Sequence, residues 1–125
     1  MKDFFELIRW NHWAKNVFVL APLFFSGDYY DISNVAQVLK AFFIFCLVSS
    51  CVYIFNDLLD YEADSAHNKK RLRPLPSGRI SKPMAVLILS IMFISACLLL
   101  YTLRMPINFT YAVLLYALIN LIYSM

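Results

Sequence analysis

The 125 residues are 62% hydrophobic and 15% charged, whereas soluble domains usually carry about a quarter charged residues. Glycine is scarce and aromatic residues are abundant, which excludes a disordered chain and a collagen-like fibre. The net charge is +3, and no basic run alternates with polar residues, so nucleic acid is not expected as a partner.

The N-terminal segment is predicted to lie on the membrane surface. Residues 3–13, DFFELIRWNHW, mix apolar and charged side chains at helical spacing, and Trp10 and Trp13 suit interfacial depth. Acidic residues near the start are not typical of a cleavable signal peptide. We therefore expect an interfacial helix over residues 1–13 that stays in the mature protein.

Four apolar stretches are predicted to cross the membrane as helices. They comprise residues 13–25, 35–55, 83–103 and 105–125. The last two are free of charge and, at about 1.5 Å per residue, can each cross ~30 Å of hydrocarbon. The first is the weakest, because Lys15 and Asn16 interrupt it. Cys46, Cys51 and Cys97 lie inside these stretches without metal-ligand spacing and are interpreted as small apolar residues.

The distribution of basic residues predicts the orientation of these helices. With the N-terminus in the cytoplasm, nine of the eleven lysines and arginines fall at the cytoplasmic face, and only Lys40 and Arg104 fall on the other. The loop between the second and third spans is therefore predicted to be cytoplasmic. Because Met125 ends the sequence inside an apolar run, we expect a truncated reading frame with further helices missing. Residues 1–125 would then be the N-terminal part of one polytopic membrane domain.

Residues 56–82 form the loop in which the predicted chemistry lies. They hold 10 of the 19 charged residues, directly after a membrane span, where a water-filled site would be built. On a helix turning about 100° per residue, Asp60, Asp64, His67 and Asn56 fall within ~100° of Asp57. Glu62 falls on the opposite side.

Three carboxylates on one face repel one another unless a cation lies among them. Asn56, Asp57, Asp60 and Asp64 are therefore predicted to bind Mg²⁺, which prefers oxygen ligands and is often shared with substrate phosphates. The three aspartates are the predicted catalytic residues. The alternative is a solvated acidic helix end that is balanced by the basic residues after it.

Basic residues complete the predicted diphosphate site. Lys70, Arg71 and Arg73 suit phosphate oxygens, although they equally suit anionic lipid headgroups. Lys15 and Asn16 are predicted to contact substrate from the first span, and the alternative for Lys15 is a lysine that extends to the membrane interface.

Residues 56–64, NDLLDYEAD, resemble the NDxxDxxxD signature of the UbiA-type prenyltransferase superfamily, and residues 73–81, RPLPSGRIS, resemble its RPLxSGxIS continuation. Residues 9–16 (RWNHWAKN), 49–55 (SSCVYIF) and 67–71 (HNKKR) resemble the decaprenyl-phosphate phosphoribosyltransferase branch. That branch usually shows HPxKRxRPIASG, whereas this chain has Asn68 in place of the proline and Leu75-Pro76 in place of Ile-Ala.

The resemblance implies an all-α integral membrane enzyme, a transmembrane bundle of about nine helices of which four are present here. It implies a bacterial inner membrane, Mg²⁺ as cofactor, and a role in cell wall biosynthesis. In that branch, phosphoribosyl diphosphate gives its 5-phosphoribosyl group to a polyprenyl phosphate lipid and pyrophosphate leaves. A second aspartate cluster in the later half of the family is absent from this chain, so the fragment alone is expected to be inactive.

Two other functions remain open from the sequence. The first is prenyl transfer from a polyprenyl diphosphate to an aromatic or other acceptor, since the same metal site serves both reactions. The second is a non-enzymatic membrane protein with an ion-binding loop. The sequence leaves the acceptor, the lipid chain length and the oligomeric state undetermined.

Overall fold

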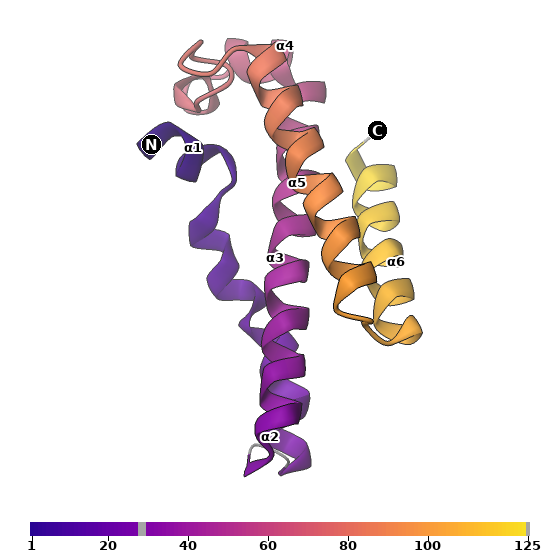
Figure 1. Ribbon diagram of the computed structural model, residues 1–125. Helices are drawn as coiled ribbons and strands as arrows, with labels where there is room; N and C mark the ends of the chain where they lie inside the picture. Colours follow the sequence, from indigo (N-terminus) through magenta and orange to yellow (C-terminus); the bar gives the residue numbers. More distant parts are fainter. Residues whose placement is uncertain (28–29, 125) are drawn as a thin grey trace.

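The computed structural model describes residues 1–27 and 30–124, and within these ranges the chain is helical and has no strand (Figure 1). In chain order the elements are α1 (Lys2–Leu7), η1 (Trp10–Leu20), α2 (Ala21–Ser26), α3 (Ile32–Leu59), α4 (Tyr61–Ala66), η3 (Lys70–Leu72), α5 (Lys82–Thr102) and α6 (Ile107–Ser124). The all-α membrane class expected from the sequence is confirmed.

Helix α3 is the central element of the fold. Asp31 caps its N-terminus by accepting a hydrogen bond from the Ser33 backbone N–H at 2.8 Å, and this bond lowers the pKa of the Asp31 carboxyl. The N-terminal segment packs along one side of α3, whereas α5 and α6 pack on the other (Figure 1). All three parts are therefore positioned by contacts with α3.

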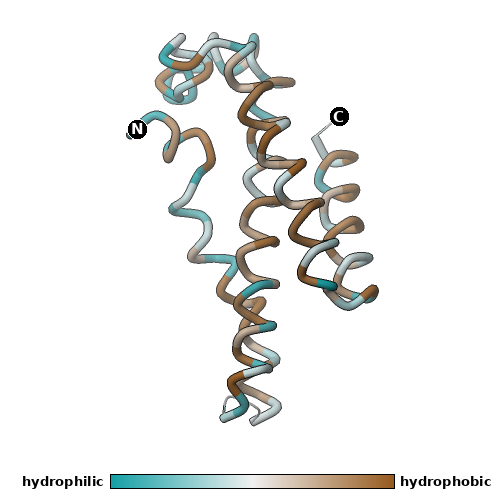
Figure 2. Tube along the Cα trace, viewed as in Figure 1, coloured by the Kyte–Doolittle hydropathy of each residue, from teal (hydrophilic) through white to brown (hydrophobic). Residues whose placement is uncertain are grey.

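Three helices in the described part of the chain are long and apolar enough to cross a membrane: α3, α5 and α6. Figure 2 shows hydrophobic residues along α5 and α6 and hydrophilic residues concentrated in the loop after α3. Most of α5 and α6 is exposed in the isolated chain, as expected for helices that face lipid or further helices. Of the three cysteines, Cys46 and Cys51 are buried as expected, and Cys97 is exposed.

The fourth expected span, over residues 13–25, differs from the prediction. It consists of the 3₁₀-helix η1 followed by the six-residue α2, and it does not qualify as a spanning α-helix. A 3₁₀-helix has three residues per turn, so side chains three apart share one face. Trp13 and Asn16 both use this spacing to reach α3, where their side chains donate to Ser50 Oγ and Cys46 Sγ. At ~2.0 Å rise per residue, η1 also extends farther along α3 than an α-helix would.

The interfacial helix expected over residues 1–13 is shorter than predicted. Helix α1 covers Lys2–Leu7, and the chain then turns at Arg9, whose φ of 52° places it in the left-handed region. This conformation is uncommon for a residue with a Cβ and indicates that surrounding contacts hold Arg9 in place. The turn directs η1 along α3 (Figure 1).

The N-terminal segment and the loop after α3 lie at the same end of the molecule (Figure 1). Arg79 of the loop joins them, because its guanidinium donates to both Glu6 carboxylate oxygens at 2.9 and 3.1 Å, to Asp3, and to the Leu72 carbonyl at 2.7 Å. The basic residues of both segments thus share one face, as their distribution in the sequence predicts. Their cytoplasmic location stays a prediction.

Ser50 fastens the N-terminal segment to α3. Its fully buried hydroxyl donates to the Ile8 carbonyl at 2.8 Å and accepts from Trp13 Nε1 at 3.0 Å. Replacing Ser50 with Ala leaves both partners unsatisfied, so we expect the protein to lose about 1–3 kcal/mol of stability. The midpoint of thermal unfolding in detergent measures this loss. Ser90→Ala is the control, since the exposed Ser90 hydroxyl donates to the Val86 carbonyl of its own helix and joins no other segment in the described part of the chain. An equal loss in both variants would contradict the expectation.

Candidate functional site

The site begins where α3 ends. The sequence predicted one helix over residues 56–67, whereas α3 ends at Leu59 and α4 begins at Tyr61. Backbone hydrogen bonds continue across the break, from the Asp60 N–H to the Asn56 carbonyl (2.9 Å) and from the Asp64 N–H to the Asp60 carbonyl (2.7 Å). The helical spacing is therefore largely retained, which keeps Asp57 and Asp64 on one side.

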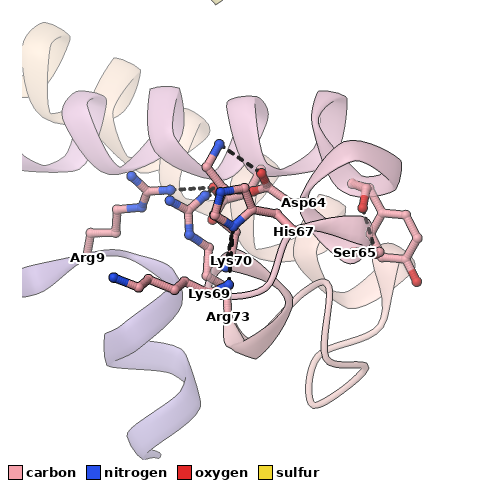
Figure 3. Close-up of polar contacts among 9 residues, drawn as sticks. Arg9, Asp64, Ser65, His67, Lys69, Lys70 and Arg73 are labelled. Atoms are coloured by element: carbon pink, nitrogen blue, oxygen red, sulfur yellow. Dashed lines mark hydrogen bonds and ion pairs between the residues drawn. The ribbon is translucent and has the colours of Figure 1, made fainter.

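Asp57 and Asp64 are the buried carboxylates of this site, with exposed fractions of 3% and 1%. Arg73 bridges them, because its Nη1 lies 3.2 Å from Asp57 Oδ1 and 2.7 Å from Asp64 Oδ2. Lys70 Nζ lies 3.0 Å from the other Asp64 oxygen, as Figure 3 shows from the side of the loop. Buried carboxylates require such partners, since an unpaired buried charge is strongly destabilising.

Arg9 is the residue at this site that the sequence interpretation missed. Its Nη2 donates to Asp57 Oδ1, and its guanidinium lies 4.6 Å from the centre of the Tyr53 ring. The contact links residues 48 positions apart, so no local spacing could predict it. Its place in the segment RWNHWAKN, which carries part of the family resemblance, was the one available signal.

The other predicted residues occupy different positions. Asn56 lies in the last turn of α3, one residue before Asp57, and its buried Oδ1 has no hydrogen-bond partner in the described residues. Asp60 is exposed, so the structure does not bring it to Asp57 and Asp64. Accordingly, no group of three His, Cys, Asp or Glu side chains suited to hold a metal occurs among residues 1–27 and 30–124.

Three of the predicted basic or polar residues lie apart from the buried carboxylates. The side chain of Asn16 bonds to Cys46 Sγ at 3.4 Å, and Lys15 is exposed on η1. Arg71 is exposed as well, and its side chain forms no ion pair within the described ranges. Contacts with substrate from these three residues stay predictions.

His67 organises the loop rather than the carboxylates. Its Nδ1 accepts hydrogen bonds from the backbone N–H groups of Lys69 and Lys70, at 3.2 and 3.3 Å (Figure 3). These bonds hold the turn that places Lys70 and Arg73 over Asp64.

The fold and the site together define a class: a polytopic helical membrane protein with a charged site at the end of a spanning helix. The model of the UbiA prenyltransferase family matches residues 17–125, so the chain belongs to this family.

Similar proteins agree with this assignment. The chain is 45% identical over 84 residues to the decaprenyl-phosphate phosphoribosyltransferase of Mycolicibacterium smegmatis, which covers 64% of this chain and 26% of the relative. It is 41% identical over 86 residues to the decaprenyl-phosphate phosphoribosyltransferase of Mycobacterium tuberculosis, and this alignment covers 64% of this chain and 28% of the relative. It is also 42% identical over 81 residues to the uncharacterized protein y4nM of Sinorhizobium fredii, and this alignment covers 65% of this chain and 16% of the relative. The aligned region thus spans less than a third of the length of these curated relatives.

Arg73 is predicted to be the main structural partner of the two buried carboxylates. Arg73→Gln leaves Asp57 with Arg9 and Asp64 with Lys70, and we expect it to destabilise the protein by roughly 2 kcal/mol. Adding Asp64→Asn removes the less well paired carboxylate and should restore part of that loss. Thermal unfolding of the single and double variants in detergent measures both effects, and a double variant less stable than Arg73→Gln would contradict the bridging role.

Proposed function

We propose that the protein is a membrane-bound transferase that moves the 5-phosphoribosyl group from phosphoribosyl diphosphate to a polyprenyl phosphate. The observation that carries the proposal is the pair of buried carboxylates, Asp57 and Asp64, held with Arg9, Lys70 and Arg73 at the end of a spanning helix. Similarity to proteins named decaprenyl-phosphate phosphoribosyltransferase supports the choice of donor and acceptor.

The residues at the C-terminal end of α3 carry oxygen ligands of the kind that magnesium prefers. The unpartnered buried Asn56 Oδ1 is such an oxygen, one residue before Asp57 in the same helix. Mg²⁺ is usually held by one or two carboxylates together with substrate phosphates, so the exposed position of Asp60 is compatible with this set. When bound, the metal supplies neutralisation of the charge that develops on the leaving diphosphate.

The basic residues have distinct proposed roles. Lys70 and Arg73 bind diphosphate oxygens, because both already lie over Asp64 and Arg offers a planar fork of donors. Lys15 and Arg71, which are exposed, contact the lipid phosphate or the anionic membrane surface. A lipid phosphate is already anionic and needs no strong base to attack, which agrees with the use of His67 in the turn.

The lipid chain requires an apolar surface next to the charged site. A cavity of about 340 Å³ lies between the three spanning helices and is lined by Val48, Phe55, Leu89, Phe93 and Leu121, among others. Phe55 directly precedes Asn56, so this cavity extends toward the end of α3 that carries the carboxylates, on the side where α5 and α6 pack. We propose that it holds the first part of the polyprenyl chain.

The reaction is tested with membranes that contain the full-length protein. We expect labelled phosphoribosyl diphosphate and polyprenyl phosphate to yield labelled lipid in the presence of Mg²⁺ and none in its absence. Prenyl transfer is the second candidate, favoured by the description of the matched family. Prenylation of an aromatic acid from a polyprenyl diphosphate, with no labelled lipid from the first assay, would establish that second function instead.

The buried carboxylates are predicted to be essential for turnover. Asp57→Asn and Asp64→Asn in the full-length protein should each lower the rate at least about 100-fold, because each removes a charged group from the diphosphate site. Membrane insertion should stay intact, which fractionation and a thermal unfolding midpoint check. Glu62→Gln is the matched control, since this exposed acid lies outside the site. Wild-type rates in both aspartate variants would show that these two carboxylates are not needed for the reaction.

A further inference from the structure

A cavity of about 280 Å³ lies next to Arg9, on the side of the cluster that faces the N-terminal segment. Trp10 forms part of its apolar wall, and its polar lining consists of Glu6, Arg9, Asn11, His12, Asp57 and Arg73. This volume is just below the range of about 300–1,000 Å³ that is typical of small-molecule sites. It suits a small polar ligand better than a lipid chain.

The charged donors of the cavity keep unused N–H groups, whereas its two acids are paired. Asp57 is 3% exposed and turns its charge toward two guanidiniums, whereas the side chains of Arg9 and Arg73 stay 21% and 33% exposed. Glu6 also lines the cavity, but both of its carboxylate oxygens accept hydrogen bonds from Arg79. The acids at this place are therefore already paired, while the guanidiniums retain unused donors.

Arg9 is held as a fixed donor. Arginine carries five N–H donors, and Arg9 uses one nitrogen on Asp57 within the described part of the chain. Its left-handed backbone, its ion pair and the Tyr53 ring together fix the guanidinium at the cavity wall. A donor fixed in this way loses little side-chain freedom when an anion binds.

His12 adds a neutral polar group to the same wall. Its ring packs edge-on against Tyr53 with centroids 5.2 Å apart, and its buried Nδ1 has no hydrogen-bond partner in the described residues. Burial, helped by the charges of Lys15 and Arg9, lowers the pKa of His12, so the imidazole is neutral near pH 7. A buried ring nitrogen without a partner is suited to a hydroxyl or oxygen of a ligand.

We propose that this cavity binds the phosphate group of a soluble phosphorylated sugar, with Arg9 and Arg73 donating to phosphate oxygens and His12 bonding to the sugar. The inference rests on the proposed function, because the phosphoribosyl donor is such a molecule. It assigns Arg9 and His12 to substrate binding, in addition to the aspartates and the basic residues of the loop. We assign a soluble ligand because the polar groups line this small cavity itself. The larger apolar cavity of about 570 Å³ that adjoins it at Phe5 and Trp10 would suit the chain of a lipid phosphate, so the test below compares the two ligands directly.

The test measures binding of ribose 5-phosphate to the full-length protein in detergent with EDTA, by calorimetry and by fluorescence of Trp10, which is half exposed at the cavity. Ribose 5-phosphate carries no diphosphate, so its binding is independent of metal and of group transfer. We expect the wild type to bind ribose 5-phosphate and to show no binding of ribose. Arg9→Gln should weaken binding about tenfold or more, through loss of charge-assisted hydrogen bonds.

Two further variants keep the test independent of folding. Arg9→Lys retains a cation beside Asp57 but lacks the planar set of N–H donors of arginine. His12→Phe retains an aromatic ring against Tyr53 but lacks the two ring nitrogens. Each should weaken binding by about three- to tenfold with an unchanged unfolding midpoint. Lys69→Gln, which removes an exposed charge from the same end of the molecule, should bind as the wild type does.

Wild-type affinity in Arg9→Gln, equal binding of ribose, or displacement of ribose 5-phosphate by short-chain polyprenyl phosphate would each overturn the assignment. If the wild type transfers phosphoribosyl while Arg9→Gln keeps full affinity, the cavity assignment fails and the proposed function stands. If binding depends on Arg9 but no labelled lipid forms from phosphoribosyl diphosphate, the proposed function fails and the sugar-phosphate cavity stands.

Discussion

The pairing of two buried carboxylates with cations from distant parts of the chain is the constraint on which the rest of this structure depends. Burying an ion costs several kcal/mol unless a partner and hydrogen bonds compensate. Asp57 and Asp64 are almost fully enclosed, so the chain must bring cations to them. Arg9 comes from the N-terminal segment, and Lys70 and Arg73 come from the loop, so three separate stretches meet at one point (Figure 3).

This convergence also accounts for the shape of the N-terminal segment. The Arg9 guanidinium contacts Asp57 near the C-terminus of α3. Trp13 and Asn16 contact side chains nearer the N-terminus of the same helix. A left-handed residue followed by a 3₁₀-helix satisfies all three contacts, since residues three apart in such a helix face the same way. The departure from a regular spanning α-helix thus follows from contacts with α3, and hydrophobicity alone does not encode it.

The parts of the fold that follow from local pattern could be predicted, and the parts that follow from distant contacts could not. Long apolar runs must form helices in lipid because their backbone groups have no other partner, which is why α3, α5 and α6 were expected. Helical spacing likewise placed Asp57 and Asp64 on one face. The break at Asp60 is a property of the turn between α3 and α4, and it left that carboxylate exposed although its spacing matched.

The choice of Arg9 as a partner for Asp57 lay beyond sequence reasoning for a related reason. Several basic residues occur at this face, and the sequence gives no reason to prefer any one of them as the partner of Asp57. The path of the N-terminal segment along α3 determines which of them reaches Asp57. The same holds for His12, whose ring packs against Tyr53, a residue of α3 that is distant in the sequence. Residue types and spacing identified where charges gather, whereas the three-dimensional path of the chain decided which charges meet.

The ion pairs of this site also bear on how a charged ligand can enter it. Arg9, Arg73 and Lys70 are three cations against the two carboxylates of Asp57 and Asp64, so the inner cluster has one positive charge in excess. The desolvation of the two carboxylates is met when the protein folds, whereas the three cations keep part of their surface exposed. An entering phosphate therefore meets an existing set of oriented donors. Oriented donors of this kind need little reorganisation when a ligand binds, and that is the property by which a protein stabilises developing negative charge better than water does.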